Sequence, residues 1–305
     1  MDRKVKEYCE KCEICNKNKT RRNRLPGLLS HLDFAKEPFE IMSLDTIGGF
    51  SDAHTKKKYL HIIIDHLTRY IFGHTSTSQK ADDFIKLIKK VSRKNNIKVL
   101  MSDQYPAIKS NKVQNFIKNN NIKMTFTSPN SPNSNGLVER ANQTITNRIR
   151  CKINSDEGNK NWSNIAQQCI REYNRTVHTV TGFEPNYLLN GEKTNIIPES
   201  MEIERNLDND RKEARDKSID CWKKNKKIVD KKRKEDDFNE KDQVYIEEQN
   251  RMNRKKLDPV RSGPHKIIKR ISNTMYEIDK KDTNSENKIV HKNKLLKCHK
   301  SNYID

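Results

Sequence analysis

The chain has 305 residues, of which only 32% are apolar and 34% are charged, so its composition excludes two large packed domains and favours one compact core with smaller or extended additions. Its formal net charge of +21 at pH 7 favours a polyanionic partner, for which nucleic acid is the default, over a Lys- and Asn-rich composition that merely keeps the chain in solution. No stretch approaches the ~20 apolar residues of a membrane span and no signal-peptide core is found, so we expect an intracellular protein with no membrane partner.

Residues 1–19 carry cysteines at a spacing typical of metal ligands. Cys12 and Cys15 form a C-x-x-C pair, which suits two ligands of one tetrahedral Zn²⁺, and Cys9 would be a third ligand. Free thiols on a frayed terminus are the alternative, because a C-x-x-C pair alone is weak evidence. The odd total of seven cysteines also favours reduced thiols over a disulfide framework. Residues 20–37 then read as a basic linker.

The stretch from residue 38 to residue 195 has the pattern of one α/β domain. Three predicted strands come first, and helices and strands then alternate. The predicted elements are strands Ile41–Gly48, Tyr59–Asp65 and Tyr70–Thr75, helix Lys80–Asn95, strand Ile97–Asp103, helix Lys109–Asn120, strand Ile122–Thr127, a helix after Gly136 and a helix Asn161–Thr176. This order predicts an RNase H-like α/β fold, a mixed sheet flanked by helices on both faces.

Three acidic residues stand out in this pattern. Asp45 lies inside an otherwise apolar strand, where an unpaired charge is costly unless a partner or a metal compensates it. Asp103 closes the apolar run I-K-V-L-M-S-D, and Glu139 lies in the first turn of the helix after Gly136. Taken singly, the last two have ordinary explanations as a turn residue and as a complement to the helix dipole. Together, the three acids are candidates for one site.

At these residues the chain resembles the catalytic core of retroviral and LTR-retrotransposon integrases, which carry two aspartates and a glutamate with the same second spacing. The other matching stretches, in order, are I-I-I-D-H-L-T-R-Y around Asp65 and Arg69, N-G-L-V-E-R-A-N around Glu139, and Y-N-R-T-V-H-T-V-T-G-F-E-P from Tyr173 to Pro185. The resemblance covers roughly Pro38 to Glu192 and, more loosely, both flanks. It implies an integrase from the Pol polyprotein of a gypsy-type element.

The resemblance implies DNA integration by two-metal phosphoryl transfer. Asp45, Asp103 and Glu139 would be the catalytic residues and would hold a pair of Mg²⁺ or Mn²⁺ ions ~3.5–4 Å apart, with Asp45 bridging. In the family, a water reaction trims the 3′ ends of element DNA, and a 3′-hydroxyl reaction joins those ends to target DNA. The implied partners are these two DNAs and further copies of the chain, acting in the nucleus.

Further residues acquire roles from the same resemblance. Asn135, Arg140 and Gln143 flank Glu139 and are candidates for contacting the DNA ends, although ordinary surface polarity explains them nearly as well. Integrases of this family carry a His-His-Cys-Cys zinc domain ahead of the core, and residues 1–19 look like its cysteine half. No histidine precedes His31, so we expect the chain to begin inside that domain.

The chain departs from the family pattern after the second aspartate. The family commonly has D-x-G-x-x-F, whereas this chain has D-Q-Y-P-A-I from Asp103 to Ile108. Pro106 fixes φ where a glycine nearby would give freedom, so we expect the turn that aims Asp103 to be altered. The alternative function is therefore a decayed or domesticated integrase that binds DNA without catalysis. A polynucleotidyl hydrolase of RNase H type is a third interpretation.

Residues 196–237 contain almost no large apolar side chains and predict a charged helical linker. A basic run within it has eight Lys or Arg residues against one acid, Asp230. A solvated helix face, a contact with DNA phosphates and a nuclear-import signal remain open for it. The eight basic residues are Lys223, Lys224, Lys226, Lys227, Lys231, Lys232, Arg233 and Lys234.

Residues 238–303 read as a second folded unit. Short β-type runs separated by turn residues predict a small β-barrel. The unit resembles the SH3-like C-terminal domain of gypsy-type integrases, in which a Gly-Pro-aromatic element precedes a strand. Here Gly263, Pro264 and His265 occupy that place. A generic small barrel of unknown use is the alternative.

Overall fold

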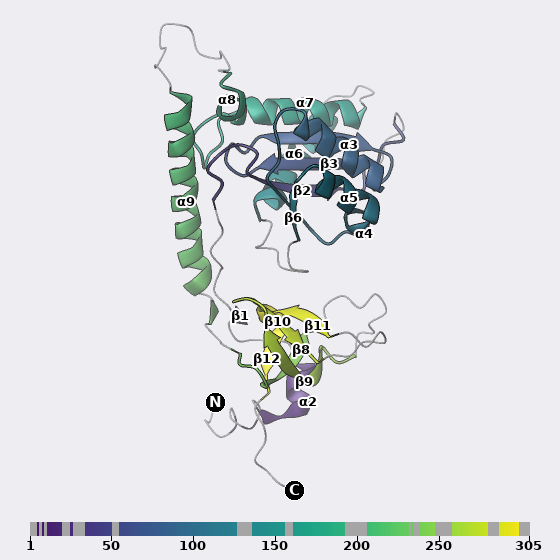
Figure 1. Cartoon of the computed structure of the whole chain (residues 1–305), viewed down its shortest axis with the longest axis vertical. Helices are drawn as coiled ribbons and strands as arrows, with labels where there is room; N and C mark the ends of the chain where they lie inside the picture. Colours follow the sequence, from purple (N-terminus) through teal and green to yellow (C-terminus); the bar gives the residue numbers. More distant parts are fainter. Residues whose placement is uncertain are drawn as a thin grey trace. The chain divides into compact units, whose positions relative to one another are not determined.

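The computed structural model divides the chain into two units (Figure 1). The residues described are 5, 8, 11–19, 25–26, 34–50, 55–126, 136–155, 161–192, 206–231, 233–234, 238–247, 258–279 and 287–298. One unit runs from Asp33 to Trp222, and the other consists of Met1–Leu32 and Lys223–Asp305. The division into five parts made from the sequence stays a prediction.

The larger unit is built on a five-stranded mixed sheet with the order β4-β3-β2-β5-β6. Its strands are β2 (Ile41–Ile47), β3 (Tyr59–Asp65), β4 (Ile71–Ser76), β5 (Val99–Ser102) and β6 (Lys123–Phe126). The three strands that come first in the chain pair antiparallel, whereas β5 runs parallel to both β2 and β6. The predicted mixed sheet is therefore confirmed.

Helices cover both faces of this sheet, as predicted (Figure 1). They are α3 (Ala81–Ser92), α4 (Pro106–Lys109), α5 (Asn111–Asn119), α6 (Gly136–Asn154), α7 (Trp162–Arg175) and α8 (Pro185–Asn190). Strand β3 shows how the sequence encodes the two layers, because its side chains alternate between faces. Ile63 packs in the cluster with α3 and α5, while Leu60, Ile62 and Ile64 pack in the cluster with α6 and α7.

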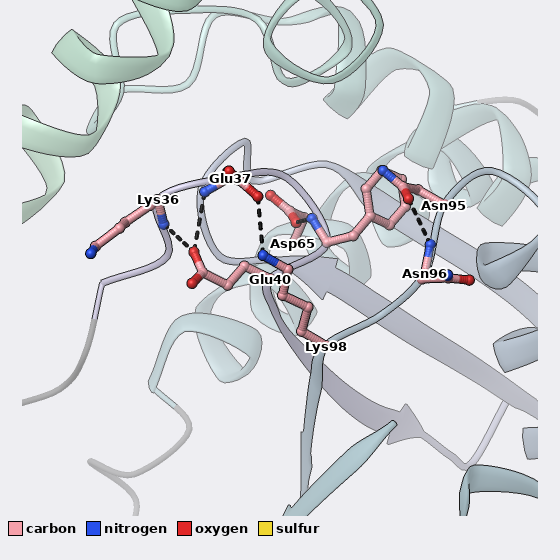
Figure 2. Close-up of polar contacts among 8 residues, drawn as sticks. Lys36, Glu37, Glu40, Asp65, Asn95, Asn96 and Lys98 are labelled. Carbon is pink, nitrogen blue, oxygen red and sulfur yellow. Dashed lines mark hydrogen bonds and ion pairs between the residues drawn. The ribbon is translucent and has the colours of Figure 1, made fainter. Parts of the chain in front are cut away.

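A buried carboxylate fixes the start of β2. Asp65 is 0% exposed and accepts four hydrogen bonds, from the backbone N–H of Phe39 (2.6 Å), Leu67 (3.1 Å) and Thr68 (2.7 Å) and from the Thr68 hydroxyl (2.8 Å). Figure 2 shows Asp65 beside the turn that contains Glu37 and Glu40. Because Asp65 binds the backbone just before β2 and the β3–β4 hairpin together, it sets the position from which β2 carries Asp45 into the sheet.

The predicted charged helix is confirmed as α9 (Leu207–Lys231), but its first half packs on the core. Arg211 donates from Nε to the carbonyl of Leu188 (2.8 Å) and from Nη2 to that of Leu189 (3.0 Å). Further along the same helix, Ala214 is fully buried. Ser218 Oγ accepts a hydrogen bond from Arg69 Nη2 (3.1 Å). Among the helices that the structure describes, none combines the length and apolar character needed to cross a membrane.

The smaller unit contains a five-stranded antiparallel sheet with the order β11-β10-β9-β8-β12. Its strands are β8 (Gln243–Glu247), β9 (Arg261–Arg270), β10 (Met275–Ile278), β11 (Lys288–His291) and β12 (Leu295–Lys297), with the 3-10 turn η3 (Lys292–Lys294) before the last. A hydrophobic cluster that includes Tyr276 and Ile278 fills one face. Within the described ranges the edge strands β11 and β12 do not pair, so closure into the predicted barrel is not seen there.

The N-terminal cysteine segment packs on this smaller sheet. Helix α2 (Glu13–Asn18) ends against Arg261 of β9, which is 4% exposed. Arg261 Nη1 donates to the carbonyl oxygens of Asn16 (2.6 Å) and Lys19 (2.9 Å). The guanidinium thereby caps the end of the helix, where the last carbonyl groups have no intrahelical donor. Strand β1 (Leu25–Pro26) also pairs in parallel with β7 (Arg233–Lys234).

Candidate active site

The fold places the three candidate acids near one another. Asp45 lies in β2 and Asp103 directly follows β5, and these strands are parallel neighbours in which Ser43 pairs with Met101. Both aspartates lie two residues after that pair, so they lie side by side at the same edge of the sheet. Glu139 lies in the first turn of α6, and that helix reaches β2 through a hydrogen bond from Asn142 Nδ2 to Asp45 Oδ2 (2.7 Å).

Electrostatics also connect the three carboxylates. Burial and, to a smaller extent, the negative charges of Asp103 and Glu139 raise the pKa of Asp45 from 3.8 to about 6. The Thr46 N–H (2.7 Å) and the Asn142 amide act in the opposite direction, because both donate to the ionised carboxylate. Asp103 and Glu139 are exposed, whereas Asp45 is half-buried. The site therefore holds carboxylates that repel one another.

The chemistry of these donors fits a hard divalent cation, which prefers carboxylate and carbonyl oxygens. Within the ranges that the structure describes, no three His, Cys, Asp or Glu side chains are already positioned to hold a metal ion. The outer two acids are exposed and can change rotamer without disturbing the core, so they can turn toward Asp45. The three residues are thus close enough to interact but not arranged as a closed set of ligands.

Asn142 is a site residue that sequence reasoning missed. Its amide nitrogen holds Asp45, and its Oδ1 is buried without a hydrogen-bond partner among the described atoms. An orphaned carbonyl oxygen beside three acids fits the presence of a cation or a water ligand there. The signal was available in the sequence, because residues three apart lie on one helix face and Asn142 follows Glu139 by three.

The turn after Asp103 needs no glycine, contrary to the expectation that it would be disturbed. Tyr105 has φ −61° and ψ 134°, an extended conformation that any residue adopts. Pro106 is the first residue of α4, where a missing N–H costs nothing and the fixed φ suits the helix. Asp103 Oδ1 accepts the backbone N–H of Tyr105 (3.3 Å). The departure from the family pattern therefore leaves an ordinary backbone.

The candidate DNA contacts are only partly brought together. Arg140 and Gln143 lie exposed on α6 near Glu139, and Asn135 is outside the described residues. In the basic run, Lys223, Lys224, Lys227 and Lys231 are exposed on α9, and Lys226 is paired with Asp230 at 2.7 Å. Arg233 is half-buried in β7, and Lys232 and the side chain of Lys234 are outside the described residues.

The cysteine pair is close together, but no third zinc ligand is found among the described residues. Cys12 is the N-cap of α2 and Cys15 lies in its first turn, and hydrogen bonds from Cys15 lower the pKa of the Cys12 thiol. Both thiols are half-buried and form no disulfide, and Cys9 is outside the described residues. Zinc binding therefore stays a prediction. Cys151, Cys169 and Cys298 also form no disulfide among the described residues.

Comparison with known proteins supports the same core. Residues 35–132 match the family described as "Integrase core domain", a range that includes Asp45 and Asp103 and ends before Glu139. The transposon Tf2-3 and Tf2-4 polyproteins of Schizosaccharomyces pombe are each 23% identical over 186 residues, which are 60% of this chain and 14% of the polyprotein. The matched part is thus a small share of these relatives.

A solved structure agrees with the fold of nearly the whole chain. A chain in the cryo-EM structure of the simian T-cell lymphotropic virus intasome in complex with PP2A regulatory subunit B56 gamma has a TM-score of 0.63 at 17% identity, and 96% of this chain and 90% of that chain are covered. Residues 35–132 are thus similar to an integrase core domain in sequence, and the fold agrees with that similarity. Its sequence relatives are transposon polyproteins, so the chain is similar to the proteins of such elements over 60% of its length.

Proposed function

We propose that this chain is a metal-dependent polynucleotidyl transferase, which trims the 3′ ends of retroelement DNA and joins them to target DNA. The observation that carries the proposal is that the fold brings Asp45, Asp103 and Glu139 near one another, where burial and, to a smaller extent, the two neighbouring charges raise the pKa of Asp45 to about 6. Gathering three acids destabilises a protein that has no ligand there, whereas a bound divalent cation offsets the repulsion.

The chain's own residues would bind and orient the reacting groups. Asp45, Asp103 and Glu139 would supply oxygen ligands to Mg²⁺ or Mn²⁺, with Asp45 held in place by Asn142 and by the Thr46 N–H. When bound, such ions lower the pKa of an attacking water or DNA 3′-hydroxyl and stabilise the leaving oxygen at phosphorus.

DNA is the partner that the charge of the chain fits best. The formal charge of +21 favours contacts with phosphates, and the exposed Lys223, Lys224, Lys227 and Lys231 of α9 offer them on one helix. Arg140 and Gln143 are exposed close to Glu139 and would contact the end that is processed. We propose that several copies of the chain act together in the nucleus, since two element ends must be joined to one target.

The second candidate is a decayed or domesticated integrase that binds DNA without catalysis. It is favoured by one observation, namely that the described acids do not already form a closed set of ligands. The ordinary backbone at Tyr105 and Pro106 speaks against it, because the departure from the family pattern does not disturb the turn that carries Asp103.

Strand chemistry separates the two candidates. The full chain, incubated with short DNA duplexes and a supercoiled plasmid in Mn²⁺, should nick the plasmid or join duplex ends to it. Asp45→Asn, Asp103→Asn and Glu139→Gln should each remove the product. The matched controls are Asp82→Asn and Glu172→Gln, which break surface ion pairs with Lys112 and Lys152 (2.6 Å each) and should leave the product unchanged. DNA binding without product in the wild type would establish the non-catalytic candidate.

A further inference from the structure

Tyr105 ties the turn after Asp103 to the core at several points. Its backbone N–H donates to Asp103 Oδ1 (3.3 Å), and its carbonyl oxygen accepts the N–H of Ile108 (3.0 Å) and Lys109 (3.2 Å) at the start of α4. The centroid of its ring lies 6.1 Å from that of the buried Phe84, a separation usual for aromatic pairs. One residue thus holds the backbone on both sides of the turn.

The hydroxyl of Tyr105 makes the shortest of these contacts. It donates to Gln79 Oε1 at 2.6 Å, and both side chains are half-buried. Gln79 lies in the connection between β4 and α3. Its Nε2 is close to Gly48, because a Cβ built on that glycine would be 3.7 Å from the Nε2 atom. Gly48 follows Asp45 by three residues in the chain. Gln79 therefore spans the space between the segments that follow the two acid-bearing strands.

The contacts of the Asp103 carboxylate itself are too weak to orient it. It is exposed, and the bonds that it accepts among the described atoms are long, from the Ser102 hydroxyl (3.5 Å) and from the Tyr105 N–H (3.3 Å). The direction of the side chain then depends on how firmly its turn is held. A site that binds a charged ligand loses affinity when its ligating groups must first be ordered.

We propose that Tyr105 and Gln79 form a positioning pair that fixes Asp103 relative to Asp45, an inference that rests on the proposed function of the three acids. The bond from the Tyr105 hydroxyl to the Gln79 carbonyl oxygen adds a side-chain anchor to the backbone bonds of the turn. Neither side chain touches the reacting groups in this role. Its effect is to hold the second acid ready for the cation.

The test is the Mn²⁺ concentration needed to raise the thermal midpoint of the full chain by one fixed amount, because the midpoint keeps rising as more metal is added. Tyr105→Phe keeps the ring and removes the hydroxyl, and Gln79→Met keeps the length and removes the acceptor. Each should raise that concentration about 5–10-fold, the effect expected of one hydrogen bond. The double variant should be no worse than the worse single variant, because the same bond is broken only once.

Tyr187→Phe is the matched control. The Tyr187 hydroxyl also donates to a side-chain oxygen at 2.6 Å, that of Asp210, and this bond joins α8 to α9. The control variant should lower the metal-free thermal midpoint about as much as Tyr105→Phe does and leave the Mn²⁺ requirement unchanged. Amide hydrogen exchange without metal should be faster across residues 103–108 in Tyr105→Phe and unchanged there in Tyr187→Phe.

The two proposals fail differently. The positioning pair alone is overturned if Tyr105→Phe needs the same Mn²⁺ concentration as the wild type and its residues 103–108 exchange their amide hydrogens at the wild-type rate. An equal rise in the Mn²⁺ requirement of Tyr187→Phe also overturns the pair, because the effect would then be a general loss of stability. A wild type that Mn²⁺ does not stabilise overturns the proposed function, and the positioning pair with it. Should Tyr105→Phe not fold, Gln79→Met decides by the same criteria, because it leaves the tyrosine ring packed.

Discussion

At the scale of single residues, Asp45 carries the strongest physical signal of function. A half-buried carboxylate with two hydrogen-bond donors would ordinarily stay ionised, yet burial and two neighbouring acids raise its pKa to about 6. The folded state therefore binds a proton there more tightly than the unfolded chain does, whose ordinary value is 3.8. Stability from this group is present at low pH and is lost as the pH rises through 6.

The pH dependence of Asp45→Asn should reveal this loss. Without metal, the free energy of unfolding of Asp45→Asn minus that of the wild type should rise between pH 4 and pH 7.5, by up to about 3 kcal/mol. The buried His61 and the half-buried His66, with pKa values lowered to about 4 and about 3, titrate in the opposite sense in both proteins and so cancel in the difference. Urea unfolding at several pH values measures it. A difference that does not change with pH would contradict the raised pKa of Asp45.

At the scale of elements, Asp65 holds together the start of β2 and the β3–β4 hairpin. Phe39 and Arg69, whose positive φ angles of 65° and 66° are unusual outside glycine, lie on either side of this carboxylate in the chain. Four donors converge on it, so the strained turns are stabilised by bonds to one buried group. Its role is to fix the strand that carries Asp45.

Asp65→Asn should therefore destabilise the core well beyond a surface change. An amide nitrogen cannot accept the bonds of Phe39 or Thr68, and each buried donor left without a partner costs about 1–3 kcal/mol. Asp82→Asn, at an exposed ion pair with Lys112, should cost less than about 1 kcal/mol. Equilibrium unfolding in urea compares the two. Equal costs for the two variants would show that Asp65 does not organise these turns.

The elements were predicted from the sequence more fully than their contacts. Apolar runs predicted β3 with the observed bounds and β2 within one residue, because buried strands leave a continuous local signal. The helix predicted over Lys109–Asn120 is confirmed as α5, whereas the short helix α4 before it was not predicted; Pro106 starts α4, and the extended Ser110 separates the two helices. The docking of α9 was not predicted, because Arg211 and Ser218 act through partners far away in the sequence.

The same distinction applies to the candidate site. Residue type and spacing drew attention to Asp45, Asp103 and Glu139, but whether those positions converge depends on strand order, which spacing alone does not determine. The bond between Asn142 and Asp45 joins residues 97 apart, and the Tyr105–Gln79 bond crosses between loops. Such contacts are decided by tertiary packing and leave no local pattern in the sequence.

At the scale of the whole molecule, a basic chain contains a small acidic centre. The charge of +21 favours DNA, while the three acids would repel its phosphates unless cations lie between them. The proposed function thus depends on metal binding at that centre more than on any other single property. A metal ion that binds only the folded state raises the free energy of unfolding, so its binding can be measured as a gain in stability.

The most direct test is the thermal midpoint of the full chain with and without Mn²⁺. At a metal concentration 100 times the dissociation constant, wild type should gain about 2.7 kcal/mol, a rise of a few degrees. Asp103→Asn should lose that gain, and its metal-free midpoint should equal or slightly exceed that of wild type because one repelling charge is gone. Mn²⁺ should raise the thermal midpoint of the control variant Asp82→Asn as much as it raises that of wild type. If Mn²⁺ does not raise the midpoint of wild type, or raises that of Asp103→Asn equally, the three acids do not form a metal site.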